Sequence, residues 1–169
     1  MTGMLRWTDY LDAEGVRLSM VAKDRMGVVQ ELAGLMAARA HVSPRELATH
    51  LLAREQLGST ATMGGVAVPH CRVAGVPRIV TCVGLHRQGV DFGDADQGRV
   101  HIFVGMVSPP DTAGLHLNVL ARIGALLRNA RLREALLTAP STAALRALLL
   151  CVEETHVSQG SEPVQARGV

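Results

Sequence analysis

Aromatic residues are scarce in this sequence. They make up 2% of its 169 residues, as one tryptophan, one tyrosine and two phenylalanines. Proteins that bind single-stranded nucleic acids stack bases on aromatic rings, and this chain has few residues to build such a surface. The net charge is only +2, and lysine and arginine form no continuous run that would attract a phosphate backbone. We therefore expect no nucleic acid among its partners.

Features of membrane and secreted proteins are also missing. No apolar stretch reaches the ~20 residues that a helix needs to cross a bilayer, so we expect no direct membrane insertion. Asp9 and Asp12 lie where a secretion signal would need apolar residues. The three cysteines, Cys71, Cys82 and Cys151, lack the spacing of a disulfide framework or a zinc site. Reduced thiols are typical of a cytoplasmic protein, and this is the location that we expect.

Aliphatic residues supply the core that the aromatics do not. Hydrophobic residues make up 48% of the chain, and its length suits one domain of ordinary size. We expect this domain to span residues 1–152. Residues 153–169 are polar and show no periodicity, which predicts a flexible C-terminal tail.

Periodicity and capping residues predict the first elements. Residues 16–22 alternate apolar and polar side chains, as a half-buried strand does. An apolar stripe at helical spacing predicts a helix over 25–40, and Asp24 can cap it. The next helix begins with a capping box, in which Ser43 is the N-cap and Glu46 occupies the third helical position.

The rest of the chain mixes short strands with helices. Residues 58–65, GSTATMGG, predict a loop because they are small and favour turns. Strands are expected at 66–68, 79–85 and 100–107, and helices at 115–128, at 132–137 and after Pro140, where Ser141 can act as a cap. This order predicts an α/β protein, a three-layer α/β/α sandwich with a small mixed sheet of four to five strands.

His70 is the first candidate for chemistry. The short apolar run 66–68 leads to it, and Pro69 fixes the backbone immediately before it. Reacting side chains are often mounted in this way, because binding sites favour the ends of strands. A histidine that merely ends a strand fits the same pattern, so the residues alone leave both interpretations open.

His116 is the second candidate. It shares one face of the helix expected at 115–128 with four apolar residues, Val119, Leu120, Ile123 and Leu127. It therefore points inward at the first helical turn. A buried histidine that bonds to the backbone would have the same spacing. We interpret His41, His50, His86 and His156 as scattered surface histidines.

Arg54 and Glu55 end the second helix just before the loop at 58–65. A solvated charge pair is one interpretation, since a cation in the last helical turn complements the helix dipole. In the other, Arg54 bends over an anion held near Thr60 and His70. Neutral imidazole is a competent nucleophile toward phosphorus. The dianionic phosphoryl group that results suits an arginine fork and a second histidine as hydrogen-bond donors.

Two rival sites use neighbouring residues. Cys71 follows His70 directly, but neighbours in an extended chain point to opposite faces, which makes them a poor catalytic pair. His116 could instead serve Cys71 as a base. A metal site built from His70, His101 and His116 has no recognisable ligand spacing. We therefore expect neither a metal nor another cofactor.

The segment REQLGSTATMGGVAVPHCR, residues 54–72, resembles the fructose/mannitol-type (type 2) EIIA domains of the bacterial phosphoenolpyruvate-dependent phosphotransferase system. The family pattern is roughly R-E, then S-T-x-x-x-G-x-A-x-P-H. The HL of GLHLNVL and the loop VDFGDADQGRV are similar to the family as well, so the likeness covers residues 5–150. Cys71 stands where the family tends to place alanine or glycine, and Gly105 interrupts a strand that is usually bulky.

This resemblance implies a phosphocarrier. His70 would accept a phosphoryl group from a phosphohistidine on an HPr-like protein, His116 would stabilise that group and Arg54 would balance its charge. Ser59 and Thr60 would lie at the binding site. Apolar residues near His70 would contact partners, and we name Met63, Val66 and Val68.

The opening LRWTDYLDAEGVRL is similar to the nitrogen-regulatory branch of the family, in which the domain stands alone and signals by its phosphorylation state. Its partners would then include regulatory target proteins. Two alternatives stay open. The chain could be a sugar-specific EIIA that feeds a separate EIIB, or a binding module that keeps the fold without transferring phosphoryl groups.

Overall fold

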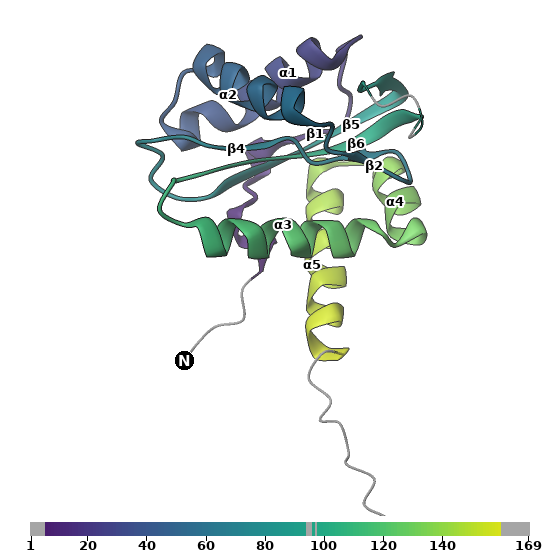
Figure 1. Cartoon of the computed structure of the whole chain (residues 1–169). Helices are drawn as coiled ribbons and strands as arrows, with labels where there is room; N and C mark the ends of the chain where they lie inside the picture. The colour runs from purple at the N-terminus through teal and green to yellow at the C-terminus, as the bar shows by residue number, and fades with distance from the viewer. Residues whose placement is uncertain (1–5, 94–95, 97, 160–169) are drawn as a thin grey trace, which may run out of the picture.

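A computed structural model describes residues 6–93, 96 and 98–159 (Figure 1). Its helices are two short 3₁₀ turns, η1 (Trp7–Tyr10) and η2 (Ala13–Gly15), and five α-helices, α1 (Arg25–Ala40), α2 (Pro44–Leu57), α3 (Ala113–Leu127), α4 (Ala130–Leu137) and α5 (Thr142–Gln159). Its strands are β1 (Val16–Arg17), β2 (Ala61–Thr62), β3 (Val66–Ala67), β4 (His70–Arg72), β5 (Val80–Asp91) and β6 (Arg99–Ser108).

Capping residues fix the helix starts as the sequence predicts. The Asp24 carboxylate accepts a hydrogen bond from the backbone N–H of Gly27 at 2.8 Å, and the Ser43 hydroxyl accepts one from Glu46 at 3.1 Å. Each bond satisfies a donor that has no partner inside its helix. Ser141 caps α5 in the same way.

The strands form one mixed sheet in the order β1-β5-β6-β3-β2, with β4 also paired to β6. The long strands β5 and β6 are antiparallel, whereas β1, β3 and β4 each join the sheet in parallel. The sheet thus has six strands, where four to five were expected. The strand expected at 16–22 stops at Arg17, and the loop expected at 58–65 contains β2.

Two helical layers cover the sheet, so the predicted α/β/α sandwich is confirmed. Figure 1 shows α1 and α2 on one face and α3, α4 and α5 on the other. Each face has its own apolar cluster. Met36, Cys82 and Val107 belong to the cluster under α1 and α2, and Met106 and Ile123 belong to the cluster on the opposite face.

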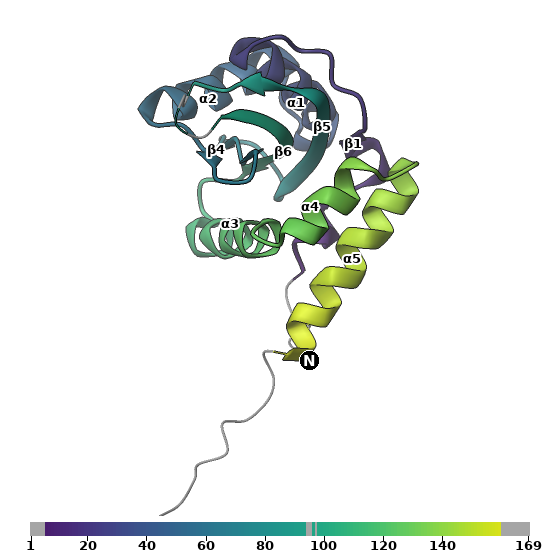
Figure 2. The same ribbon diagram turned by 90° about the vertical axis from the view of Figure 1, so that its right-hand side faces the viewer.

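The C-terminal helix continues past the point where we expected the tail to begin. α5 runs to Gln159, and Figure 2 shows its last turns extending beyond the layers. Glu153, the first residue assigned to the tail, is buried. Its carboxylate accepts hydrogen bonds from the backbone N–H groups of Trp7 and Thr8 at 2.7 and 3.3 Å. These bonds tie the N-terminal segment to the helix. Residues 160–169 of the expected tail lie outside the described residues.

Within residues 6–93, 96 and 98–159, no helix combines the length and the apolar character that crossing a membrane requires.

Gly105 provides a test of the packing between β6 and α1. A Cβ atom at this position would lie 2.7 Å from Sγ of Cys82 and 3.0 Å from Cε of Met36. Gly105→Ala should therefore lower the free energy of unfolding by about 1–3 kcal/mol, as overpacking does. Gly34→Ala is the matched control, because a Cβ there meets nothing within 4 Å and α1 should gain about 0.8–1 kcal/mol from the better helix former. Urea unfolding measures both, and shifts of the same sign would contradict the packing described.

Candidate functional site

His70 is the first residue of β4, where the chain returns to the sheet after β3. It pairs in parallel register with Met106 of β6, whose N–H donates a hydrogen bond to the carbonyl of Pro69 at 3.0 Å. Side chains alternate along a strand, so His70 and Cys71 lie on opposite faces. Cys71 belongs to the cluster under α1 and α2, and His70 lies on the α3 side of the sheet, next to His116.

One ring nitrogen of His70 is committed to the backbone. Nδ1 lies 2.7 Å from the carbonyl oxygen of Val68. A carbonyl oxygen can only accept, so Nδ1 carries the proton and donates it. In the neutral ring, the lone pair is then on Nε2. The half-buried imidazole is held with a nucleophilic Nε2.

His116 faces His70 from the first turn of α3. The centroids of the two rings are 5.5 Å apart, and the ring planes are inclined at 58°. Only 3% of His116 is exposed, and its Nδ1 is hydrogen-bonded to the hydroxyl of Ser108 at the end of β6. The expected inward orientation of His116 is confirmed, and its polar partner is a side chain.

Both imidazoles are neutral at physiological pH. Burial is the main cause that lowers the pKa of His116 to about 4, and the nearby His70 and Arg72 contribute to this shift. Burial is also the main cause that lowers the pKa of His70, with smaller contributions in the same direction from Arg54 and Arg72. The hydrogen bond to Val68 and the charge of Glu55 oppose this shift. A neutral imidazole keeps the lone pair that a nucleophile needs.

Arg54 and Glu55 have different roles. The half-buried Arg54 donates a hydrogen bond from Nη1 to the carbonyl of Gly58 at 2.9 Å, and its charge reaches His70. Glu55 is only 1% exposed, so the interpretation of these residues as a solvated charge pair is wrong for Glu55. Its carboxylate accepts hydrogen bonds from both the backbone N–H, at 3.0 Å, and the hydroxyl of Thr60. The pair therefore shapes the loop after α2.

The other predicted site residues differ in accessibility. Thr60 bonds to Glu55, and the Ser59 hydroxyl accepts a hydrogen bond from the N–H of Ala61 at 3.1 Å, so both side chains stabilise the loop. Val68 is half-buried. Met63 is 83% exposed, but the turn that follows it bonds to His101 near the start of β6, whereas His70 pairs with Met106 near the end of that strand, so Met63 does not lie near His70 as we expected. Val66 is only 2% exposed and packs in the core on the α3 side, so our expectation that it contacts a partner is corrected.

Cys71 is a poor nucleophile in this environment. Burial raises the pKa of its thiol to about 12, which leaves very little thiolate at neutral pH. Its side chain lies across the sheet from His116, so that histidine cannot serve it as a base. The structure therefore favours His70 over Cys71 as the reacting group.

Sequence reasoning missed Arg72 and Ser108. Arg72 follows His70 by two residues in β4, which places both on one face of the sheet, and its charge lowers the pKa of both histidines. Because side chains two residues apart in a strand lie on the same face, the spacing between His70 and Arg72 could have identified Arg72 from the sequence. Ser108 pairs with Arg72 in the β4–β6 register, and no local pattern marks that contact.

His86 is not the surface histidine that we expected. It is 8% exposed within β5, and its Nε2 donates a hydrogen bond to the carbonyl of Ala22 at 2.7 Å. His101 bonds to the carbonyl of His86 through Nδ1 at 3.0 Å. Among the described residues, no three His, Cys, Asp or Glu side chains are grouped so that they could hold a metal ion.

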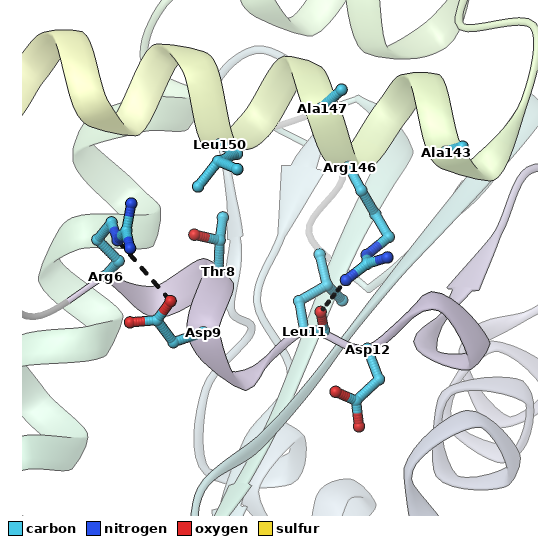
Figure 3. A pocket seen from close by; sticks show the side chains of 9 residues that line it. All are labelled: Arg6, Thr8, Asp9, Leu11, Asp12, Ala143, Arg146, Ala147 and Leu150. Carbon is cyan, nitrogen blue, oxygen red and sulfur yellow. Dashed lines mark hydrogen bonds and ion pairs between the residues drawn. The ribbon is translucent and has the colours of Figure 1, made fainter.

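A pocket of about 500 Å³ lies elsewhere, between the N-terminal segment and α5 (Figure 3). The charged side chains that line it have partners within the protein. Arg6 lies 3.8 Å from Asp9, and Arg146 donates a hydrogen bond to the carbonyl of Leu11 at 3.2 Å. None of the residues that line this pocket belongs to the histidine site.

Comparison with known proteins identifies the family. The sequence model of the "Phosphoenolpyruvate-dependent sugar phosphotransferase system, EIIA 2" family matches residues 9–151. A "Nitrogen regulatory protein" of Pseudomonas aeruginosa is 33% identical over 128 residues, which are 75% of this chain and 82% of that protein. A protein of the same description from Bradyrhizobium diazoefficiens is 30% identical over 122 residues, 72% of this chain and 80% of its own length.

Comparison of the fold agrees with the comparison of the sequence. The crystal structure of nitrogen regulatory protein IIA-Ntr from Neisseria meningitidis superimposes with a TM-score of 0.80 at 30% identity, over 84% of this chain and 97% of that one. The histidine pair thus lies within the part of the chain that the family model matches. This chain belongs to the EIIA type 2 family of the phosphoenolpyruvate-dependent sugar phosphotransferase system.

Proposed function

We propose that the protein carries a phosphoryl group on Nε2 of His70, which it accepts from a phosphohistidine on an HPr-like protein. The observation that carries this proposal is the hydrogen bond from Nδ1 of His70 to the Val68 carbonyl, 2.7 Å long, because it leaves the Nε2 lone pair free. This lone pair forms the new P–N bond while the P–N bond of the donor breaks and its electron pair returns to the donor imidazole. The Nδ1 proton of His70 stays on the hydrogen bond to Val68.

The charged residues around His70 would stabilise a phosphoryl group on its ring. The bonds that form and break are alike, so the protein need only align them and balance the charge that passes. Arg54 and Arg72 supply positive charge close to His70. Arginine pairs well with phosphoryl oxygens. His116 offers a ring nitrogen within reach of a group on His70. Together they support the roles proposed for Arg54 and His116.

An exposed apolar side chain beside the site suits transient docking. Leu117, directly after His116, is 60% exposed. Val68, whose carbonyl accepts the hydrogen bond from His70, is half-buried. Apolar residues beside a reacting group favour contact with another protein. We propose Leu117 and Val68 as contacts for the HPr-like carrier, and we place the exchange in the cytoplasm, as the reduced cysteines led us to expect.

We further propose that the phosphorylation state of His70 is a regulatory signal. The relatives from Pseudomonas and Bradyrhizobium and the Neisseria structure are all described as nitrogen regulatory proteins. A phosphoryl group changes the local charge by almost two units, which can alter a partner's affinity without a change of fold.

A sugar-specific role is the second candidate. The "PTS system fructose-specific EIIABC component" of Bacillus subtilis is 25% identical over 83% of this chain, which spans 22% of that protein. In this role His70 would pass its phosphoryl group to a separate EIIB. The lower identity favours the regulatory role.

Phosphorylation of His70 is tested by incubating the protein with a phosphorylated HPr-type carrier. Intact-mass measurement should detect one acid-labile phosphoryl group in the wild type and in Cys71→Ala, and none in His70→Ala. Cys71→Ala is the matched control, because it changes the next residue on the opposite face of β4. An unlabelled wild type beside an active donor would refute the carrier and favour a binding module. Label that persists in His70→Ala would place the phosphoryl group elsewhere.

The role of His116 is tested by separating acceptance from onward transfer. In His116→Ala we expect acceptance from the carrier to slow less than onward transfer to an EIIB-type acceptor, because the missing N–H no longer supports the phosphoryl group while it leaves His70. Single-turnover quench experiments with each partner measure this. Rates equal to the wild type with both partners would show that His116 only packs.

The lowered pKa of His116 predicts a loss of stability in acid. An unfolded histidine takes up a proton near its ordinary pKa of about 6.5, whereas folded His116 does so only near about 4. The unfolded state therefore binds more protons as the pH falls through this window, and stability declines. His116→Gln should lose less stability than the wild type between pH 7 and pH 4.5, as measured by urea unfolding. The exposed His50→Gln should behave as the wild type, and equal losses in all three proteins would contradict the shift.

A further inference from the structure

Ser108 is fully buried at the last position of β6. Its backbone carbonyl accepts a hydrogen bond from the N–H of Val73 at 3.0 Å, which fixes the residue against the chain that leaves β4. In the parallel register it pairs with Arg72, so its side chain points to the same face of the sheet as Arg72 and His70. The hydroxyl is thus directed at the site by the backbone.

The Ser108 hydroxyl is bonded to Nδ1 of His116. It makes no other hydrogen bond among the residues that the structure describes. A serine hydroxyl carries a single proton, and a buried hydroxyl costs free energy unless that proton has an acceptor. Nδ1 of His116 is the acceptor available, so the hydroxyl donates to it. The ring proton of His116 then belongs on Nε2.

The position of that proton decides what His116 can do. The ring is neutral near pH 7, because burial lowers its pKa to about 4. A neutral imidazole has one N–H, and the oxygens of a dianionic phosphoryl group can only accept hydrogen bonds. With the proton on Nε2, His116 can donate to a group on His70. With the proton on Nδ1, it would present a lone pair to the same oxygens and repel them.

The two histidines therefore have opposite partners. His70 bonds through Nδ1 to a carbonyl, an obligate acceptor, which places its proton on Nδ1 and its lone pair on Nε2. His116 bonds through Nδ1 to a hydroxyl, which can donate, so that its proton is on Nε2. One ring is prepared as a nucleophile and the other as a hydrogen-bond donor.

We propose that Ser108 is a positioning residue that holds His116 in the Nε2–H tautomer, so that the neutral ring donates a hydrogen bond to the phosphoryl group on His70. This inference rests on the proposed function, since it presumes that His70 is phosphorylated. Ser108 itself does not contact the phosphoryl group and acts through His116.

The matched pair Ser108→Thr and Ser108→Val tests the tautomer. The two side chains have the same shape and suit a strand, and only threonine keeps the hydroxyl. Two-dimensional ¹H–¹⁵N spectra of the imidazole nitrogens assign each ring proton without any phosphoryl donor. We expect Nε2–H for His116 in the wild type and in Ser108→Thr, and a shift toward Nδ1–H in Ser108→Val. Thr81→Val is the control, because it removes another fully buried hydroxyl, one bonded to the carbonyl of Tyr10. It should leave the tautomer of His116 unchanged.

The transfer equilibrium tests the consequence. With a phosphorylated HPr-type carrier, Ser108→Val should lower the equilibrium constant for phosphorylation of His70 about tenfold, the effect expected from the loss of one hydrogen bond to a charged group. Ser108→Thr and Thr81→Val should stay close to the wild type. Chemical shifts of the backbone amides in both Ser108 variants verify that the fold is kept.

The outcomes separate the two proposals. An Nδ1–H tautomer in the wild type, or an unchanged Nε2–H tautomer in Ser108→Val, would overturn the role of Ser108 whether or not the protein is phosphorylated. A changed tautomer with an unchanged transfer equilibrium would overturn it as well. Failure of the wild type to accept a phosphoryl group would instead refute the proposed function, and with it the purpose that we assign to the tautomer.

Discussion

The three residues of β4 pair in parallel with the end of β6, and this pairing holds both halves of the site at one edge of the sheet. It sets His70 beside Met106 and Arg72 beside Ser108. β6 then leads through a short proline-containing turn into α3, whose first turn carries His116. The two imidazoles reach each other because one lies on β4 and the other on the helix that follows its partner strand. A shift of the register by one residue would turn His70 toward the opposite core.

Local rules sufficed for much of the fold. The bounds of α1 and the start of α2 follow from Asp24, Ser43 and an apolar stripe, because capping and periodicity act within a few residues. β2 escaped prediction because a strand of two residues is defined by its pairing with β3 and has no periodicity of its own. We assigned Glu153 to a tail because no local pattern indicates its hydrogen bond to Trp7, which lies 146 positions away in the sequence.

The features of the site also divide into those that local sequence predicts and those that depend on the folded chain. His70 stood out because the proline before it is a local feature. The likeness of His70, His116 and Arg54 to the family led us to choose between interpretations that the residues left open, and their roles stay predictions. The sequence could not predict the hydrogen bond from His70 to Val68 or the burial of Glu55, because each depends on how the chain turns after a helix or strand. Cys71 stands next to His70, yet the alternation of a strand separates it from the chemistry.

Burial explains why the site needs partners that select a tautomer. A charged imidazolium would be a simpler donor to the phosphoryl group that we propose on His70, but burying it beside Arg72 is costly, and the pKa of His116 is lowered accordingly. The site must then work with neutral rings, each of which has one proton to place. A carbonyl at one ring and a hydroxyl at the other place these two protons differently while both rings stay neutral. The same arrangement lets the positive charge come from arginines, which keep it at any physiological pH.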